Sequence, residues 1–296
     1  MKIGLIHLTQ RVDSWGFYWA WELRRRGHEV VYLPEEVGPF PEAAWREIAC
    51  DVFVRIDDSQ SFDTPDWCRP LIYLCSDTHV SDGVKRHKIA FEADHTFFCQ
   101  KNAKSIQYGT GQYEWMPHAA WFFPERQKVL SLDVCSFMVL GEDIHPIFGE
   151  RSRLARRLDD ILNERLTHDT PESLREFKTK IRGGVFHQEM AAEYARAHIV
   201  WHHSVGNDIA MRHFEGAACG ACVVSSRIVD NGMEIFGDLI PQYDTSDECI
   251  DLIRSLLAKP DECAERGREL RKLVEGRHRY AHRVDRVLAK AEELVG

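Results

Sequence analysis

Short apolar runs alternate with stretches of helical periodicity along the first half of the chain. Five runs have the length and the Val, Ile and aromatic content of buried strands, and they cover residues 2–8, 28–33, 51–56, 70–75 and 94–99. Residues 14–26 place apolar side chains at helical spacing, with Ser14 as the expected N-cap and Gly27 as the stop signal. A second helix is expected over residues 41–49. Strands that alternate with helices in this way predict a doubly wound parallel sheet.

The alternation breaks at residues 117–124, Pro-His-Ala-Ala-Trp-Phe-Phe-Pro, and then begins again. The second half has strand-like runs at residues 134–141, 198–202 and 221–225, and helical spacing at residues 151–165, 188–197 and 208–219. Three further helices are expected over residues 246–257, 260–275 and 278–295. We therefore predict two Rossmann-like α/β domains, residues 1–126 and 127–296, with the helical tail in the second; one long single sheet is the alternative.

The composition is that of a water-soluble globular protein, because 44% of the residues are hydrophobic and 29% are charged. The formal net charge is −9, and neither half has an excess of Lys and Arg. Nucleic-acid binders usually carry a basic face that neutralises phosphates, so the charge disfavours DNA or RNA as the main partner.

The N-terminal apolar run is short and is interrupted by His7, which is typical of a first strand and not of a signal peptide. No window approaches the roughly 18 uninterrupted apolar residues of a membrane-spanning helix. The nine cysteines are an odd number scattered through predicted strands and helices, which indicates a reducing compartment. We therefore expect a cytoplasmic protein that does not insert into membranes.

Two spacings could suit zinc, and for both we favour a structural role. Cys219 and Cys222 form a Cys-x-x-Cys pair, which also suits thiol redox chemistry, but no second pair completes four ligands. His278 and His282 stand four residues apart on an expected helix, and no third ligand is evident. Packing in the core is therefore the favoured interpretation of the cysteines, and local structure that of the histidines.

Other charged groups have similar alternatives. Asp57 and Asp58 resemble an acidic metal motif, but we expect no metal site there. The basic runs at residues 24–26 and 85–88 are typical of solvated helix faces, with a patch for an acceptor phosphate as the alternative.

Residues 201–226 have the densest chemical signal, since they read as strand, glycine-bearing loop, helix, glycine and strand. In an open parallel sheet, ligands bind beyond the carboxyl ends of strands, where backbone N–H groups and helix dipoles meet phosphate; Gly206 and Asn207 are expected there. Arg212 and Glu215 stand three apart on the following helix, so they lie on neighbouring positions of one face. The guanidinium could clamp a diphosphate and the carboxylate could accept from ribose hydroxyls, whereas the alternative is an ordinary surface ion pair.

This stretch resembles the CgeB-like branch of the group-1 glycosyltransferases, in which an Arg-x-Phe-Glu-x-x-x-x-Gly pattern precedes an apolar strand. Here the pattern runs from Arg212 through Phe214 and Glu215 to Gly220. The resemblance extends over most of the chain and includes Met233-Glu-Ile-Phe236, His278-Arg-Tyr-Ala-His-Arg283, Gly27-His-Glu-Val30, Asp51-Val-Phe53 and Met116-Pro-His-Ala119.

The resemblance implies a GT-B architecture, that is, two Rossmann-like domains whose parallel sheets face one another across a cleft. It also implies a nucleotide-sugar donor held by the second domain, with Glu215 on the ribose and Arg212 near the phosphates. Asn207 stands where many retaining relatives have the first Glu of a Glu-x7-Glu pattern, so the stereochemistry stays open. GT-B enzymes generally stabilise the leaving diphosphate without a metal, and we expect Lys180 or Arg182 to add positive charge. No cofactor beyond the donor is expected.

The acceptor is expected to meet the ends of first-domain strands. Asp13, Asp77 and His79 follow such strands and are candidates for the general base, with capping and loop hydrogen bonds as the alternative roles. His118 lies at the expected hinge, where it would line the cleft or serve the structure.

Three functions remain open at this point. The first is metal-independent transfer of a sugar to a hydroxyl-bearing acceptor. The second is a non-catalytic protein that binds a nucleotide or a partner, and the third is a nucleotide-sugar epimerase. The sequence names neither the sugar, the base nor the acceptor.

Overall fold

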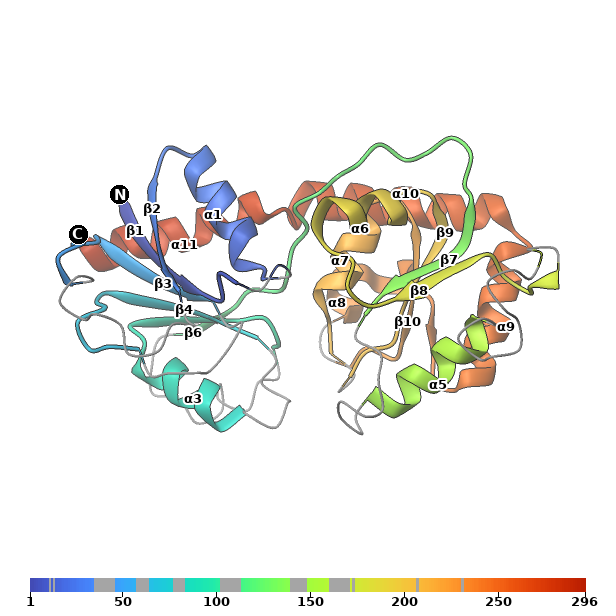
Figure 1. The fold of residues 1–296 in the computed structure, drawn as a ribbon, viewed down its shortest axis with the longest axis horizontal. Helices are drawn as coiled ribbons and strands as arrows, with labels where there is room; N and C mark the ends of the chain where they lie inside the picture. The colour runs from blue at the N-terminus through green and yellow to red at the C-terminus, as the bar shows by residue number, and fades with distance from the viewer. Residues whose placement is uncertain are drawn as a thin grey trace. The chain divides into compact units, whose positions relative to one another are not determined.

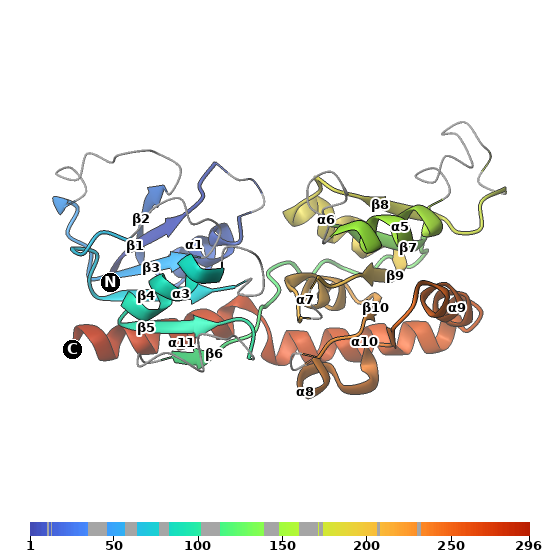
Figure 2. The same cartoon turned by 90° about the horizontal axis from the view of Figure 1, so that it is seen from below.

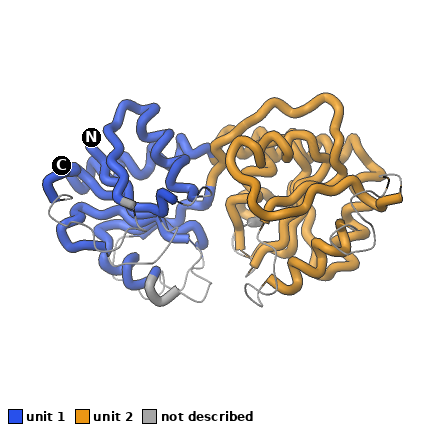
Figure 3. The backbone as a smooth tube through the Cα atoms, in the orientation of Figure 1, with its two compact units in different colours: residues 1–118, 279–296 blue, residues 119–278 orange. Residues whose placement is uncertain are grey.

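The computed structural model describes residues 1–10, 12, 14–34, 46–56, 64–76, 83–101, 113–138, 148–159, 171, 174–205, 208–229 and 232–296. The chain forms two compact units (Figure 3). Unit 1 comprises Met1–His118 and Arg279–Gly296, and unit 2 comprises Ala119–His278. Each unit contains one parallel sheet with helices packed against it, as predicted.

Unit 1 has a six-stranded sheet in the order β2-β1-β3-β4-β5-β6. Its strands are β1 (Lys2–His7), β2 (Glu29–Pro34), β3 (Val52–Ile56), β4 (Leu71–Cys75), β5 (His95–Phe98) and β6 (Tyr113–Trp115), and all of their pairings are parallel. Figure 1 shows α3 (Gly83–Glu92) on one side of this sheet and α1 (Gly16–Arg25) and α11 (Tyr280–Val295) on the other. Because both faces are covered, β3, β4 and β5 are buried along their whole length; β4 is apolar throughout, whereas β3 contains buried Arg55 and β5 contains buried His95 and Thr96.

Unit 2 has a five-stranded sheet in the order β11-β10-β9-β7-β8. The strands are β7 (Leu132–Phe137), β8 (Thr179–Arg182), β9 (Ala197–His202), β10 (Cys222–Ser226) and β11 (Gln242–Tyr243). The helices, seen from a second direction in Figure 2, are α5 (Gly149–Leu158), α6 (His187–Tyr194), α7 (Met211–Ala218), α8 (Gly232–Phe236), the 3₁₀ helix η3 (Gly237–Leu239), α9 (Ser246–Leu257) and α10 (Pro260–Arg277).

Alternate residues of the unit 2 strands enter two separate cores. In β9, Val200 packs in a core with α6 and α7, whereas Ile199 and Trp201 pack in a core with α5 and α9. The same alternation runs through β7 and β10, so each face of the sheet has its own layer of helices. A substitution in α9 therefore disturbs a different core from a substitution in α7.

The boundary between the units falls after His118, earlier than the predicted boundary after residue 126. The segment in between is held by unit 2. Arg271 on α10 donates to the carbonyl of Pro124 at 2.6 Å, and Arg126 donates to the carbonyl of Ala197 at 2.6 Å. These charge-assisted bonds to backbone oxygens explain why a segment without regular structure belongs to the second unit.

The last helix was predicted correctly as a helix, but its assignment to the second domain was wrong, because α11 belongs to unit 1. The buried guanidinium of Arg283 donates to the carbonyls of Pro117 at 2.7 Å and His118 at 2.9 Å. Tyr280 packs edge-on against Trp19 of α1, with ring centroids 5.7 Å apart. The helical spacing showed an apolar face but not which sheet would cover it.

Smaller differences concern element ends and short strands. Ser14 does not cap α1, which begins at Gly16 with Trp15 at the N-cap position; the Ser14 hydroxyl instead accepts from the Gly16 N–H at 3.2 Å. Gly27 ends the helix as predicted, with φ of 82°. The short strands β6, β8 and β11, and the helices α3 and α8, were not predicted. The predicted helix 41–49 lies almost wholly outside the described residues.

No helix in the described ranges is long and apolar enough to cross a membrane.

Candidate functional site

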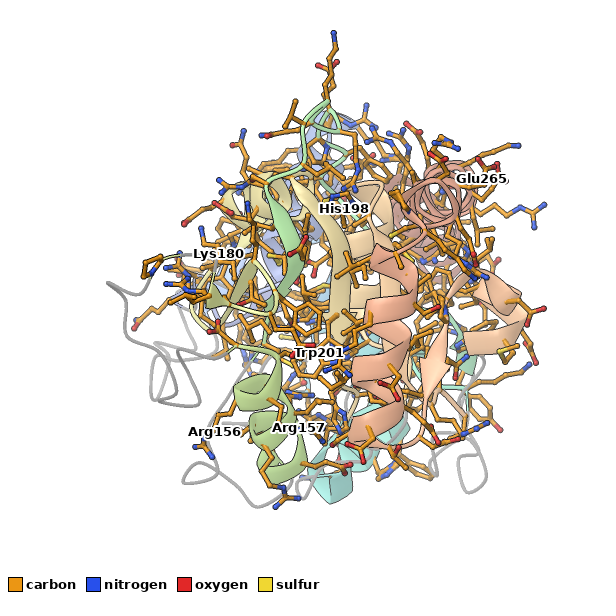
Figure 4. The ribbon with its side chains drawn as sticks, turned by 90° about the vertical axis from the view of Figure 1, so that its right-hand side faces the viewer. Arg156, Arg157, Lys180, His198, Trp201 and Glu265 are labelled. Atoms are coloured by element: carbon orange, nitrogen blue, oxygen red, sulfur yellow. The ribbon has the colours of Figure 1, made fainter. Side chains whose placement is uncertain are left out.

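Three strands of the unit 2 sheet end at one edge, and two helices begin there. The strands β7, β9 and β10 run parallel and end at Phe137, His202 and Ser226. Helix α7 begins shortly after β9, and α5 follows β7 along the chain. In Figure 4, β9 runs from His198 toward Trp201, and α5 lies at the same end of the sheet as Trp201. Carboxyl ends of parallel strands are where open α/β sheets bind ligands.

The start of α7 is a suitable place for an anion. Its N-cap residue, Ala210, has no side-chain acceptor, and its first turn contains no acidic residue. Before the helix, the Ser204 hydroxyl lies 2.5 Å from the Asp208 carboxylate and 2.7 Å from the Asp208 carbonyl, and the Ser204 N–H donates to the Ser226 hydroxyl at 2.8 Å. A helix N-terminus that lacks a carboxylate keeps its positive end available to phosphate.

Arg212 lies in the first turn of α7 and is anchored by one side of its guanidinium. Its Nε donates to the carbonyl of Phe137, the last residue of β7. Among the residues that the structure describes, no acceptor lies within hydrogen-bonding distance of its Nη1 and Nη2 atoms. The fork is thus held in place while two nitrogens remain for a ligand, which suits bidentate binding of a phosphate.

Arg151, in the first turn of α5, adds a second guanidinium that the sequence analysis missed. It is 7% exposed, and its Nε donates to the carbonyl of His203 at 2.9 Å. Burial, together with the nearby charge of Arg212, lowers the pKa of Arg151 to about 10. The Asp208 carboxylate opposes this shift, so the two guanidiniums and one buried carboxylate leave an excess of positive charge at this end of the sheet. The available signal was its position as the first residue of a predicted helix that follows a strand.

Glu215, on the next turn of α7, is a buried carboxylate to which no described residue donates a hydrogen bond. It is 8% exposed, and no donor of the described part of the chain lies within hydrogen-bonding distance of its oxygens. Burial raises its pKa from 4.5 to about 7, against the opposing effect of the Arg212 charge. Burial of an ionised carboxylate costs stability, and a ligand that donates hydrogen bonds to it would offset that cost.

Two other predicted cations lie on β8 and are paired with α6. Lys180, labelled in Figure 4, forms an ion pair with Glu193 at 2.7 Å, and Arg182 forms one with Glu189 at 3.6 Å. Arg182 pairs in register with Phe137, so it lies at the same strand edge as Arg212. The structure therefore brings Arg182 closer to the anchored guanidinium than Lys180, which lies farther back along the strand.

Gly220 was predicted to be part of the ligand site, but it lies at the other edge of the sheet. It has φ of 73° and ends α7, with its N–H donating to the Ala217 carbonyl at 2.9 Å. The strand β10 begins after it. A Cβ on Gly267 of α10 would lie 2.3 Å from the Gly220 oxygen, so the two backbones touch. Gly220 is required for a helix end and for close packing, not for contact with a ligand.

Several predicted residues lie outside the described residues, namely Asp13, Asp77, His79, Gly206, Asn207, Asp57 and Asp58. His118 is described: it is 9% exposed, packs against Trp15 with ring centroids 5.2 Å apart, and is the last residue before the chain enters unit 2. A hinge or cleft-lining role for His118 stays a prediction.

The remaining zinc and redox alternatives are not supported by the described geometry. Cys219 and Cys222 are buried free thiols in the unit 2 core, and burial raises the pKa of Cys219. The ring of His278 packs against Phe214 at 5.3 Å, and His282 Nδ1 accepts from the N–H of Arg279 at 3.2 Å. Within the described ranges, no group of three or more His, Cys, Asp or Glu residues is arranged to hold a metal ion.

The two basic runs are largely engaged in local structure. Arg24 donates to the Tyr32 hydroxyl at 2.9 Å, and Arg25 pairs with Glu22 at 2.6 Å. In the second run Arg86 is buried, and Lys88 pairs with Glu92 at 3.8 Å. These contacts agree with the structural interpretation of both runs.

His202 provides a prediction about stability. Its ring is 2% exposed, and neither nitrogen has a hydrogen-bond partner in the described structure. Burial holds its pKa well below 6.5, so the folded protein keeps it neutral while the unfolded chain takes up a proton below pH 6.5. We expect His202→Leu to raise the free energy of unfolding by about 1 kcal/mol at pH 8, and by more at pH 5.5, in denaturant titrations. A variant less stable than the wild type at both pH values would contradict this account.

A known protein family matches the part of the chain that contains this candidate site. Residues 147–289 match the family model described as glycosyl transferase-like, and this range contains Arg151, Arg212 and Glu215. No curated protein sequence matches the chain significantly.

Solved structures resemble the chain over its whole length. Sucrose-phosphate synthase from Thermosynechococcus elongatus aligns over 99% of both chains, with a TM-score of 0.68 and 12% identity. Alr3699/HepE of Anabaena, in complex with UDP and glucose, aligns over 99% of both chains, with a TM-score of 0.66 and 14% identity. BGT of phage T4, in complex with its UDP-glucose substrate, aligns over 100% of this chain and 97% of the other, with a TM-score of 0.58 and 14% identity.

These similarities show that the fold is GT-B. Together with the family match they support the predicted group-1 glycosyltransferase family, whereas the CgeB-like branch stays a prediction.

Proposed function

We propose that the protein is a glycosyltransferase that moves a sugar from a nucleotide-sugar donor to a hydroxyl-bearing acceptor. One observation carries the proposal: at the carboxyl ends of the unit 2 strands, a buried carboxylate that receives no hydrogen bond from the described residues lies one helical turn from an anchored guanidinium whose Nη atoms have no acceptor among those residues. Nucleotide sugars offer the complementary pair of groups, since a ribose has two hydroxyl donors and a diphosphate has several anionic acceptors. The family match and the UDP named in similar structures support the same assignment.

In this mechanism Glu215 accepts hydrogen bonds from the ribose hydroxyls, and Arg212 binds the diphosphate through its Nη atoms. Arg151 and the N-terminus of α7 add positive potential where charge develops on the leaving diphosphate. In this proposal Arg182 supplies further positive charge at the same end of the sheet. Gly206 and Asn207 belong to the donor site through the loop that precedes α7. For the acceptor, we keep Asp13, Asp77 and His79 of unit 1 as candidates for the general base.

We propose that arginines, and not a metal ion, stabilise the leaving group. The test is a thermal-shift screen against UDP-, GDP-, ADP- and dTDP-sugars, with and without EDTA, because a ligand that binds only the folded state raises the melting temperature. We expect at least one donor to raise the melting temperature equally in both conditions, and transfer to continue in EDTA. Metal-reversible loss of the shift would contradict the metal-free proposal.

The same screen separates the alternative functions. Release of nucleoside diphosphate from the stabilising donor is expected for a transferase. A shift without turnover would indicate a binding protein, and conversion of the donor to an isomer without transfer would indicate an epimerase. The absence of any shift from any donor would contradict the proposed function as a whole.

A further inference from the structure

A buried histidine joins the first turn of α7 to the neighbouring strand. His213 is 0% exposed and stands between Arg212 and Glu215 in sequence. The backbone nitrogen of Ala210, at the N-cap, lies 3.0 Å from His213 Nδ1. On the other side of the ring, Nε2 lies 2.8 Å from the hydroxyl oxygen of Ser225 in β10.

The ring lies against both main-chain groups of Ala210, since Nδ1 is 3.0 Å from its nitrogen and 3.1 Å from its oxygen. With the proton on Nε2, Nδ1 accepts from the Ala210 N–H and Nε2 donates to the Ser225 hydroxyl oxygen; with the proton on Nδ1, that atom donates to the Ala210 carbonyl and Nε2 accepts from the Ser225 hydroxyl. Both tautomers join the start of α7 to β10. Glu or Gln usually fills this position, three residues after the N-cap, and accepts from the N-cap N–H. With the proton on Nε2, His213 performs that task and also reaches the sheet.

The ring is confined by its surroundings. The ring of His202 meets it edge-on, with centroids 4.7 Å apart at 80°, and Phe236 packs at 6.4 Å. Farther along α7 the helix touches the sheet directly, because a Cβ on Gly216 would lie 2.8 Å from Val200 Cγ1. The first turn of α7 is thus fixed to β10 by hydrogen bonds, and the next turn is fixed to β9 by close packing.

We propose that His213 is a positioning residue of the donor site: through Ala210 and Ser225 it fixes the first turn of α7, and so the places of Arg212 and Glu215, without touching the donor. This inference rests on the proposed function. Because the ring points into the core and not toward a ligand, any effect on donor binding must pass through the helix.

The test compares variants that keep or remove the two hydrogen bonds. His213→Phe keeps a ring but loses both bonds, whereas Gln at the same position can accept from Ala210 and donate to Ser225. Affinity is measured by calorimetry for whichever of UDP, GDP, ADP and dTDP binds the wild type most tightly, and KM and kcat are measured for its sugar. We expect about 10-fold weaker binding for His213→Phe, the loss of roughly two net hydrogen bonds, and at most about twofold for His213→Gln. The rise in KM should exceed the fall in kcat, because the chemistry itself is untouched.

Ser225→Ala tests the other end of the link. We expect an intermediate loss of affinity, and a double variant with His213→Phe no weaker than His213→Phe alone, since both changes break the same connection. Ile253→Val is the matched control, because Ile253 of α9 packs in the core on the other face of the sheet. It should lower the melting temperature without changing affinity.

The outcomes distinguish this inference from the proposed function. If the wild type binds a nucleoside diphosphate and both His213→Phe and Ser225→Ala bind it equally well, the inference is overturned and the proposed function stands. If His213→Phe does not fold, wild-type affinity in Ser225→Ala overturns the inference by itself. If the wild type binds none of the four nucleotides, the proposed function fails and the inference fails with it.

Discussion

Replacing Arg212 by Ala is expected to lower transfer by about 10²- to 10³-fold, the usual effect of losing one fixed donor to developing charge. The guanidinium is anchored through Nε to the end of β7, and its Nη atoms have no acceptor among the described residues, so in the proposed mechanism they meet the diphosphate without reorganisation. Arg212→Lys should rescue little of the activity, because an ammonium cannot bond the Phe137 carbonyl and fork toward phosphate at once. The measurement is the rate of nucleoside diphosphate release at saturating donor.

Arg151 should behave similarly but less strongly, because it acts from α5 beside Arg212. The matched control is Arg157→Ala on the same helix: its guanidinium is half-exposed and pairs with Asp247 of α9 at 2.7 Å, and Figure 4 labels it on α5. We expect the control to keep wild-type turnover, since an exposed ion pair contributes little.

Wild-type turnover in Arg212→Ala, with donor binding intact, would remove Arg212 from the mechanism.

The sheets were predictable because parallel strands buried on both faces leave continuous apolar runs in the sequence. The strands β1, β3, β4 and β5 are largely apolar, with a single charged or polar residue or two in β1, β3 and β5, and the structure places each within a residue or so of its predicted bounds. Short edge strands leave a weaker signal. The three residues of β6, for example, include exposed Tyr113, and they pair with only one neighbour.

The periodicity of a helix did not predict the unit to which the helix belongs. In α11 the apolar stripe is formed by Tyr280, Val284, Val287 and Ala291, which identifies a face to be buried but no partner for it. The partner is settled by contacts far along the chain, such as the bond from Arg283 to the Pro117 carbonyl. Local patterns contain no information about such pairings.

Some residues of the candidate site were also predictable from the sequence, and others were not. Arg212 and Glu215 could be predicted because they share one helix and one motif, so their proximity is a matter of spacing. Arg151 was missed because its place at the start of a predicted helix is a weak signal, and what fixes it is a bond to the carbonyl of His203, just beyond the end of β9. Gly220 was misassigned because a glycine in a motif can serve a ligand or a helix end, and only its backbone conformation distinguishes the two.

Glu215→Gln is expected to make the unliganded protein more stable while it weakens donor binding. The pKa of this carboxyl is raised from 4.5 to about 7 in the folded state, so the folded protein holds a proton that the unfolded chain has released between these values. Ionised Glu215 therefore costs stability increasingly as the pH rises through this window, and the cost is complete above about pH 7. Gln does not titrate, so the Glu215→Gln variant does not lose this stability.

The expected gain in the free energy of unfolding for Glu215→Gln is close to zero at pH 4.5 and about 3 kcal/mol at pH 8, the size of the pKa shift. Denaturant titrations at both pH values measure it, and all other titrating groups cancel in the comparison. A difference between the two proteins that does not change with pH would show that the carboxyl titrates normally.

Donor binding should move in the opposite direction, because the ribose hydroxyls require an acceptor that the amide supplies only in part. We expect Glu215→Gln to bind a nucleotide sugar about 10- to 100-fold more weakly at pH 8, the loss of a hydrogen bond to a charged group. Wild-type affinity should also fall as the pH drops below 7 and Glu215 takes up its proton, whereas the affinity of Glu215→Gln should stay level. A nucleotide sugar is the right probe, since its diphosphate diester does not titrate in this range. Equal affinities at pH 8 in a folded variant would mean that Glu215 does not touch the donor, and its missing hydrogen-bond partners would have to come from another ligand.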